Sequence, residues 1–341
     1  MVTLRDVARR AGVSTSTVSH VLNGTRPVSE ELRRRVLDAM HELGYEPNAV
    51  ARSLKVNRSN TIGLIISDIS NPFFTAVVRG VEDVAQARGY TVILCNSDED
   101  VAKETTYLKV LRSKRVDGLI LAPAGRPHEY LRNLVKADFP LVFLDRDIEG
   151  LGVAAVLLDN EGAARQAVRH LVDLGHRRIG MITGRPSIST TTERLAGYLA
   201  ALREAGLPVD ERLIVSGGSS IEGGRAAANA LLDLDPRPTA IFSANNLMTI
   251  GALVAIDARG LSIPEDIALV GFDDFPWSGV LRPRLTTVAQ PTYELGRMAA
   301  EVLLRRLAGS RSEPPERVVL PGKLTVRESC GARPEVRQGA W

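Results

Sequence analysis

Cysteines and long apolar runs are scarce in this chain, and each shortage excludes a class of protein. The two cysteines, Cys95 and Cys330, lie far apart and match no metal-binding or redox spacing. No apolar run reaches the ~18 residues that a membrane helix requires, and charge begins at Arg5, so the N-terminus has no apolar signal region. We therefore expect a cytoplasmic protein without membrane contact, in which Cys95 is a buried thiol.

The motifs that mark common enzymes and metal sites are also missing. The five histidines follow no metal-ligand spacing, and we find no Gly-x-Ser-x-Gly elbow, phosphate-cradling Gly-Lys loop or dinucleotide fingerprint. Asp145 and Asp273 are the candidates for an acid–base pair, but nothing in their sequence context raises a carboxyl pKa. We expect no catalytic residue, no metal and no cofactor.

The composition indicates a folded chain with several domains and a basic front end. Hydrophobic residues make up 44% of the 341 residues, enough for two or three domains with sizeable cores. Residues 1–60 hold ten Lys or Arg and six Asp or Glu, whereas the whole chain has a net charge of only +3. A basic head on a near-neutral body suits a small module that binds a polyanion, although a solvated basic helix gives the same count.

The first stretch, TLRDVARRAGVSTSTVSHVLN (3–23), predicts two short helices joined by a tight turn. Thr3 and Asp6 form a capping-box pattern, Gly12 suits a left-handed turn position, and Ser14 suits the N-cap of the second helix. The second helix turns short polar side chains outward, namely Thr15, Ser16, Thr17, Ser19 and His20. Such a surface is typical of a helix-turn-helix that reads base edges in a major groove, although an ordinary helical hairpin has the same pattern.

A third helix and a short linker complete the predicted head. Ser29 suits the N-cap of a helix that ends at Gly44, and Arg26 in the preceding loop is placed to reach a phosphate or a base edge. The expected apolar face of this helix comprises Leu32, Val36, Leu37 and Met40. The segment 47–55 is too short to be a stable free helix. Besides a fraying linker, it can be a hinge helix that forms when two copies pair on DNA, with Leu54 wedged into the minor groove beside Lys55.

These segments, together with LGYEPNAVARSL (43–54) and TIGLIIS (61–67), resemble the LacI-type family of bacterial transcription repressors. The resemblance implies that Thr15, Ser16 and His20 contact the major groove. It also implies DNA contact by Arg26 and entry of Leu54 and Lys55 into the minor groove. Members of the family usually bind a near-palindromic operator as dimers, so a homodimer on double-stranded DNA is the expected assembly.

From Thr61 onward, apolar runs alternate with helical patterns, which predicts a doubly wound parallel α/β body. Strands are expected at 62–67, 91–96, 118–122, 141–145, 154–158, 179–183, 213–216, 240–243 and 267–271, and helices at 74–88, 101–113, 161–174, 192–204, 224–233 and 248–259. So many strands predict two lobes, joined near 159–160, 285–290 and 318–320. The family's body is of this type and is similar to periplasmic sugar-binding proteins.

Polar and aromatic residues follow several of the expected strands, where ligands bind in open α/β sheets. The candidates for effector contact are Asn71, Phe73, Phe74, Asp145, Arg146, Thr190, Arg194, Asn245 and Asp273. Each has a structural alternative as a helix cap, a surface ion pair or an aromatic cover. The resemblance adds weight to two of them, because Arg194 in ERLAGY and Asp273 in VGFDD match the family's effector-contacting arginine and aspartate.

The class of effector is less closely determined. Carboxylates and an arginine that converge on a cleft suit a polyol. The family often has Asn-Asp where this chain has Asn245-Asn246, and Ser219 stands where purine-responsive members tend to have an aromatic residue. These features favour a sugar or sugar derivative, which acts by allostery as inducer or corepressor. A nucleobase or another small metabolite as corepressor is the alternative.

The resulting domain plan has four parts. We expect a helix-turn-helix head at 1–46, a hinge at 47–60, a two-lobed effector-binding and dimerisation core at 61–330, and a flexible tail at 331–341. A rival hypothesis is a solute-binding protein whose head is irrelevant, but it would need an export signal, which we do not find. An enzyme on the same α/β body is the other rival.

Overall fold

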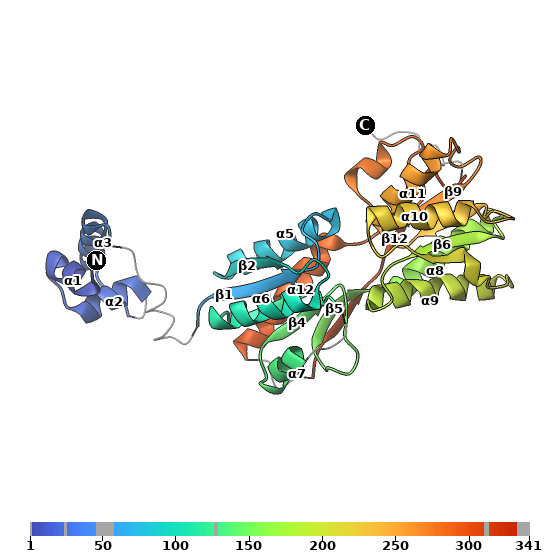
Figure 1. Ribbon diagram of the computed structural model, residues 1–341. Coiled ribbons are helices and arrows are strands. Elements are labelled where there is room, and N and C mark those ends of the chain that lie inside the picture. Colours follow the sequence, from blue (N-terminus) through green and yellow to red (C-terminus); the bar gives the residue numbers. More distant parts are fainter. Residues whose placement is uncertain (1, 24–25, 46–57, 126–128, 310–313, 333–341) are drawn as a thin grey trace. The chain divides into compact units, whose positions relative to one another are not determined.

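The computed structural model describes residues 2–23, 26–45, 58–125, 129–309 and 314–332. The chain separates into two compact units, Met1–Ser59 and Asn60–Trp341, and both are drawn in Figure 1. The expected hinge at 47–55, with Leu54 and Lys55, and most of the expected tail lie outside the described residues.

The first unit is a head of three helices, α1 (Leu4–Ala11), α2 (Thr15–Asn23) and α3 (Glu30–Leu43). Thr3 and Asp6 form the predicted capping box on α1, and the Ser14 hydroxyl accepts a 3.1 Å bond from the Thr17 N–H at the start of α2. Gly12 ends α1 with φ 65°, a left-handed conformation that costs glycine nothing. The predicted start and end of α1 and the predicted start of α2 are therefore confirmed.

The small core of the head differs from the prediction at one residue. The core joins Val7, Ala8 and Val18 to Val36 and Ala39 of α3. Leu37, expected on the apolar face, is 46% exposed, because the inward stripe of α3 passes through Val36 and Ala39, whereas position 37 lies on the next face of the helix. The prediction for Leu37 was wrong.

The first lobe of the second unit is a six-stranded sheet in the order β11-β5-β4-β3-β1-β2. Its strands are β1 (Thr61–Ile66), β2 (Thr91–Asn96), β3 (Gly118–Leu121), β4 (Leu141–Leu144), β5 (Ala154–Leu158) and β11 (Arg317–Leu320). Its helices are α5 (Pro72–Ala87), α6 (Val101–Ser113), α7 (Glu129–Lys136) and α12 (Thr292–Ala308). All pairings in this sheet are parallel, as expected for strands buried on both faces.

The second lobe repeats the plan in the order β12-β10-β9-β8-β6-β7. Its strands are β6 (Ile179–Thr183), β7 (Ile214–Ser216), β8 (Ala240–Ser243), β9 (Ala268–Phe272), β10 (Thr286–Ala289) and β12 (Lys323–Thr325). Its helices are α8 (Asn160–Asp173), α9 (Ser189–Glu204), α10 (Ile221–Leu232) and α11 (Asn246–Ala258), with 3-10 turns at Glu211–Leu213 and Pro276–Gly279. The edge strand β12 is antiparallel to β10, whereas the other neighbours are parallel.

The chain passes between the lobes three times, close to the predicted places. It crosses after β5, after β10 and after β11, so that α12 returns to the first lobe and β12 to the second. The predicted strands agree with the structure to within one residue at either end, but the sequence analysis missed α7, α12, β10 and β12. Helix α12 packs on α5, where a Cβ on Gly80 would lie 2.2 Å from the Tyr293 carbonyl oxygen. Glycine is therefore needed at position 80.

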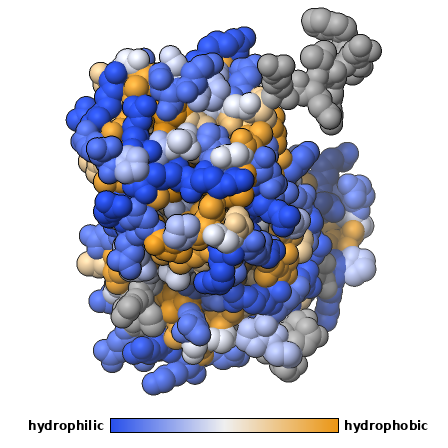
Figure 2. Space-filling model, turned by 90° about the vertical axis from the view of Figure 1, so that its right-hand side faces the viewer, coloured by the Kyte–Doolittle hydropathy of each residue, from blue (hydrophilic) through white to orange (hydrophobic). Residues whose placement is uncertain are grey.

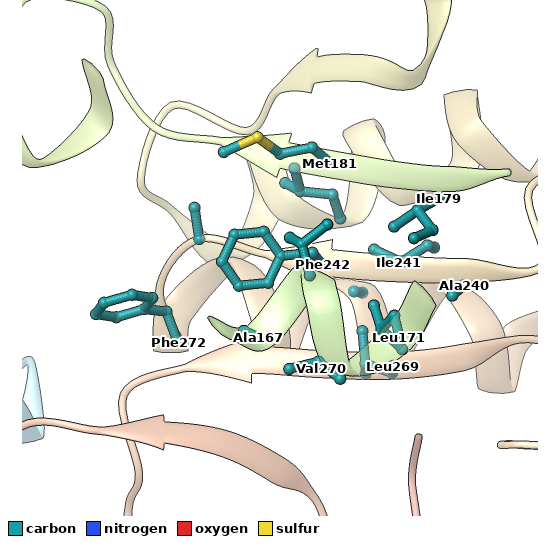
Figure 3. Packing of buried hydrophobic residues seen from close by; sticks show 14 of the residues in the cluster. Ala167, Leu171, Ile179, Met181, Ala240, Ile241, Phe242, Leu269, Val270 and Phe272 are labelled. Atoms are coloured by element: carbon teal, nitrogen blue, oxygen red, sulfur yellow. The ribbon is translucent and has the colours of Figure 1, made fainter. Parts of the chain in front are cut away.

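Apolar side chains fill the cores of both lobes, and others remain at the surface. Figure 2 shows a face on which hydrophobic side chains appear between hydrophilic ones. Inside the second lobe, Met181, Phe242 and Val270 come from neighbouring strands, and Leu171 reaches them from α8 (Figure 3). Across the described ranges, no helix is both long and apolar enough to span a membrane.

Candidate functional site

The polar row predicted on α2 lies on the surface of the head. Thr15 and Ser16 are exposed, while Thr17 and His20 are half-buried. The Ser14 hydroxyl lies 2.7 Å from that of Ser16 and 2.8 Å from that of Thr17. Thr15 and Ser16 therefore present short polar side chains to solvent, as a base-reading helix requires.

Two arginines of the head have different roles in the structure. Arg26 is exposed, and its contact with DNA stays a prediction. Arg35 instead donates from Nη2 to the Ala11 carbonyl at 2.6 Å, which satisfies a free carbonyl at the end of α1. The guanidinium of Arg35 therefore holds α3 against the turn of the helix-turn-helix, a role that sequence analysis missed.

All nine residues predicted to contact an effector line one cavity between the two lobes. The first lobe contributes Asn71, Phe73, Phe74, Asp145 and Arg146, and the second contributes Thr190, Arg194, Asn245 and Asp273. The cavity volume is about 70 Å³, well below the roughly 300 Å³ at which ligand pockets begin. Entry of a sugar or a base therefore requires the lobes or these side chains to move.

Two aspartates hold matching positions in the two lobes. Asp145 follows β4 and Asp273 follows β9, and both have a left-handed backbone, with φ 66° and φ 73°. Aspartate tolerates this conformation better than most residues, and backbone strain of this kind gathers at functional sites. Burial raises the pKa of Asp145 above its ordinary value.

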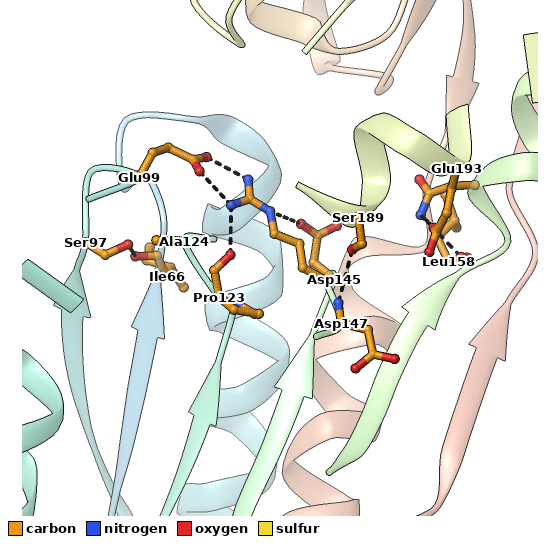
Figure 4. A network of polar contacts seen from close by, with 12 residues as sticks. Ile66, Ser97, Glu99, Pro123, Ala124, Asp145, Asp147, Leu158, Ser189 and Glu193 are labelled. Carbon is orange, nitrogen blue, oxygen red and sulfur yellow. Dashed lines mark hydrogen bonds and ion pairs between the residues drawn. The ribbon is translucent and has the colours of Figure 1, made fainter. Parts of the chain in front are cut away.

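Arg146 is held by a carboxylate that sequence analysis did not single out. Its Nη1 and Nη2 donate to the two oxygens of Glu99 at 2.7 and 2.6 Å, and Nη1 also donates to the Pro123 carbonyl (Figure 4). Burial by itself would raise the pKa of Glu99, but the adjacent Arg146 outweighs burial and holds that pKa below its ordinary value. This pair is a buried, bidentate salt bridge, and the terminal nitrogens of Arg146 are bonded to the protein.

Arg194 lies on the opposite wall and is engaged less completely. Its Nε donates to Asn160 at 2.8 Å, its Nη1 donates to the Ala244 carbonyl at 2.6 Å, and its guanidinium stacks 3.7 Å from the Phe272 ring centroid. Burial lowers the pKa of Arg194, while Asp273 and Asp145 oppose that shift. Within the described residues, Nη2 has no acceptor, so one donor remains for a ligand.

The aromatic residues form one corner of the cavity. Phe73 and Phe74 are buried, and their rings meet edge to face with centroids 4.9 Å apart. The preceding Asn71 caps α5, because its Oδ1 accepts the Phe73 N–H at 3.0 Å. The rings thus have both the structural role of covering the helix start and a position against the cavity.

The two predicted residues at helix starts of the second lobe differ in their contacts. Asn245 caps α11 by accepting the Met248 N–H at 2.8 Å, the structural alternative considered for it. Helix α9 begins at Ser189, three residues before the predicted start, so Thr190 lies in its first turn. Among the described groups, no side chain caps this helix; Thr190 and Thr191 line the cavity, and the Thr191 N–H donates to the Ile188 carbonyl at 3.1 Å.

Other residues complete the site without a clear signal in the sequence. Glu99 lies in a turn and Gln290 at a crossing between the lobes, and only the fold brings them to the cavity. Gln290 donates from Nε2 to Asp273, while its buried Oε1 has no partner among the described residues. No group of His, Cys, Asp and Glu in the described part of the chain could hold a metal ion.

Two family models match this chain, one for each unit. Residues 3–48 match the family model for bacterial regulatory proteins of the lacI family. Residues 59–328 match the model for periplasmic binding proteins and the sugar-binding domain of the LacI family.

Individual relatives match over nearly the whole chain. The HTH-type transcriptional repressor PurR of Photobacterium profundum is 40% identical over 96% of this chain and 98% of its own length. The transcriptional regulator CelR in complex with cellobiose is 36% identical, covering 96% of this chain and all of CelR, with a TM-score of 0.74. The lac repressor dimer bound to operator and the anti-inducer ONPF is 32% identical, covers 97% and 99% of the two chains, and has a TM-score of 0.86.

Proposed function

The chain belongs to the LacI family of bacterial regulatory proteins, and we propose that a small molecule in the interlobe cavity controls its affinity for an operator. The chain is a DNA-binding transcriptional repressor, and its relatives are repressors rather than enzymes. The observation that carries the proposal is the convergence of nine polar and aromatic side chains from both lobes on one cavity. A ligand that contacts both lobes binds their open and closed arrangements with different affinities, which is the condition for allosteric control.

A purine nucleobase is the effector class that the curated relative favours, because that relative is PurR. The cavity has chemistry for such a ligand. Phe73 and Phe74 provide apolar surface for a flat ring, Asp273 accepts ring N–H groups, and Arg194 Nη2 donates to a ring nitrogen or carbonyl oxygen. The nucleobase thus takes precedence over the sugar expected from the sequence.

A sugar remains the second candidate on a specific observation. CelR, which covers nearly the same length, is known as a cellobiose complex. Ser219 lines the cavity, where an aromatic residue would add a second stacking surface for a base. Carboxylates at positions 145 and 273 also suit the hydroxyl groups of a sugar.

We further propose that the repressor acts as a homodimer on a near-palindromic duplex. The lac repressor relative is a dimer on its operator. The major-groove contacts would come from Thr15, Ser16, Thr17 and His20, with further contacts from Arg26, Leu54 and Lys55.

A binding experiment tests this function directly. The full chain is used to select duplexes from a random pool, and operator affinity is then measured with and without adenine, guanine, ribose and cellobiose. We expect a purine to change the operator Kd by about tenfold, within the usual range of allosteric coupling. A response to sugars only would favour the second candidate. Failure to select any sequence would contradict operator binding.

A further inference from the structure

Carboxyl groups outnumber guanidinium groups around the interlobe cavity. Four carboxyl groups line it, from Asp68, Glu99, Asp145 and Asp273, and two guanidinium groups, from Arg146 and Arg194. Asp145, Asp273 and both arginines are less than 10% exposed, so water screens their charges weakly. When all these groups are ionised, the wall has two negative charges in excess, which repels an anion.

Arg146 cannot serve as an anion receptor in this arrangement. A phosphate is usually bound by the planar fork of an arginine, and Glu99 already occupies that fork with two bonds of 2.6 and 2.7 Å. A phosphate would have to displace a buried carboxylate, which then lies beside it without a partner. Such an exchange replaces one anion by another and adds repulsion between them.

Arg194 also offers too little for a phosphate. Asn160 and the Ala244 carbonyl hold two of its nitrogens, and Asn160 in turn donates to Glu193 at 2.8 Å. The guanidinium is fixed in place over Phe272, so only Nη2 faces a ligand. One donor nitrogen suits a single carbonyl, hydroxyl or ring nitrogen better than three phosphate oxygens.

Two of the three helix starts at the cavity are closed to anions. The N-terminus of α5 is capped by Asn71, and that of α11 by Asn245. At α11 the Asp273 carboxylate also accepts the Asn246 N–H at 3.2 Å, in the position where a bound anion would lie. The third start, that of α9, faces a cavity that also contains the Asp145 carboxylate.

The hydrogen-bond acceptors that line the cavity favour a ligand with hydrogen-bond donors. Asp145 Oδ2 lies 3.4 Å from Arg146 Nε, and the two Asp273 oxygens accept one bond each, from the Asn246 N–H and the Gln290 amide, so both carboxylates keep lone pairs for a ligand. The buried Oε1 of Gln290 has no partner in the described ranges. A ligand with several N–H or O–H groups satisfies these atoms. Phosphate oxygens at neutral pH are acceptors and do not.

We propose that the cavity selects an uncharged, unphosphorylated effector that is rich in hydrogen-bond donors, and that the Glu99–Arg146 pair excludes phosphorylated relatives of that effector. The inference rests on the proposed function and narrows it. Free nucleobases and free sugars are accepted, whereas nucleotides and sugar phosphates are rejected.

A screen of matched pairs tests this selection. Operator affinity of the full chain is measured with adenine, guanine, ribose and glucose, and with AMP, GMP, ribose 5-phosphate and glucose 6-phosphate. We expect an unphosphorylated compound to have the largest effect and its phosphorylated partner to bind at least about tenfold more weakly, because like charges in a cavity are costly. A stronger effect of a phosphorylated compound, or no effect of any uncharged one, would overturn the inference. The wider proposal of effector control fails only if neither set has an effect.

Removing the charge of Glu99 tests the mechanism of exclusion. Glu99→Gln keeps the shape of the side chain but frees part of the Arg146 fork, so the preference for the unphosphorylated partner should narrow by about tenfold. Asp68→Asn is the matched control, because it removes one of the counted cavity charges but leaves the Arg146 fork occupied, since Asp68 is bonded to Ser70; it should narrow the preference less than Glu99→Gln does. An unchanged preference in folded Glu99→Gln, or an equal change in Asp68→Asn, would refute the role of the pair.

Discussion

The Asn246 amide donates from Nδ2 to Oδ1 of Asn71 at 2.7 Å, and this bond joins the two lobes across 175 positions of the sequence. The same Asn71 oxygen accepts the Phe73 N–H, and the Asn246 N–H donates to Asp273. The start of α11, the aromatic corner and the second aspartate thus form one connected set of hydrogen bonds. An aspartate at position 246 could not donate this bond when ionised.

Asn246→Asp should therefore destabilise the contact between the lobes. Two carboxyl or amide oxygens would face each other, and an unpaired buried acceptor costs roughly 1–3 kcal/mol. We expect a lower melting temperature and a weaker affinity for the effector. Asn133→Asp, on the exposed side of α7, makes the same chemical change away from the cavity and should leave both measurements unaltered. Equal behaviour of the two variants would contradict the importance of the bond.

Gly12→Ala should destabilise the helix-turn-helix. The new Cβ would lie 2.8 Å from Arg35 Nη2, and the residue must also keep φ 65°. The left-handed conformation alone costs an L-residue about 1–2 kcal/mol, to which the displaced Arg35 adds. Hydrogen exchange of the α1 amides in the full chain measures the loss. Gly44→Ala is the control for conformation alone, because its Cβ would meet no atom within 4 Å; it should have the smaller effect.

Arg194→Gln should abolish the effector response while operator affinity without effector stays near that of the wild type. The substitution removes the Nη2 that faces the ligand. It also removes the positive charge that offsets the carboxylates of Asp145 and Asp273. Operator binding is titrated at several effector concentrations. Arg203→Gln, on the exposed face of the same helix, is expected to respond normally. A full response of Arg194→Gln would remove this arginine from the effector site.

His170 should make stability depend on pH. Burial lowers the pKa of His170 below its ordinary value of 6.5, so the folded state prefers the neutral imidazole, whose Nε2 lies 3.2 Å from the buried Cys330 Sγ. Above pH 6.5 this preference does not change the free energy of unfolding. As the pH falls through 6.5, the unfolded chain takes up the proton first, and the free energy of unfolding decreases. Between pH 7.5 and 5.5, the melting temperature of the wild type should therefore fall further than that of His170→Gln. If His170→Gln and the exposed-site control His41→Gln show the same slope, His170 is not the cause.

Leu54→Ala should weaken specific operator binding far more than nonspecific binding. This prediction comes from the sequence alone, since a wedge in the minor groove acts by bending the duplex. Affinities for the selected operator and for a random duplex of equal length are compared at one salt concentration. Equal losses on both duplexes would count against a wedge.

The sequence alone was enough for the local structure of the head and for most of the parallel strands. Helix caps and tight turns depend on neighbours within four positions of the sequence. The local sequence is therefore sufficient to predict the caps at Thr3, Ser14 and Ser29 and the turn at Gly12. It also placed nine residues at one site, because strand ends in an α/β sheet share an edge. Helix α12 escaped prediction, as did the short edge strand β12, which is stabilised by pairing with a distant strand.

The tertiary structure alone decided how the charges of the site are paired. Arg146 was a predicted ligand contact, but the fold brings Glu99 from a turn 47 positions earlier and joins the two. Arg35, one of the basic residues of the head, is turned onto the end of α1 in the same way. Charge and spacing in a sequence indicate which groups can interact. Which of them do so depends on distances set by packing of the whole lobe, since a buried charge must find whatever partner the fold supplies.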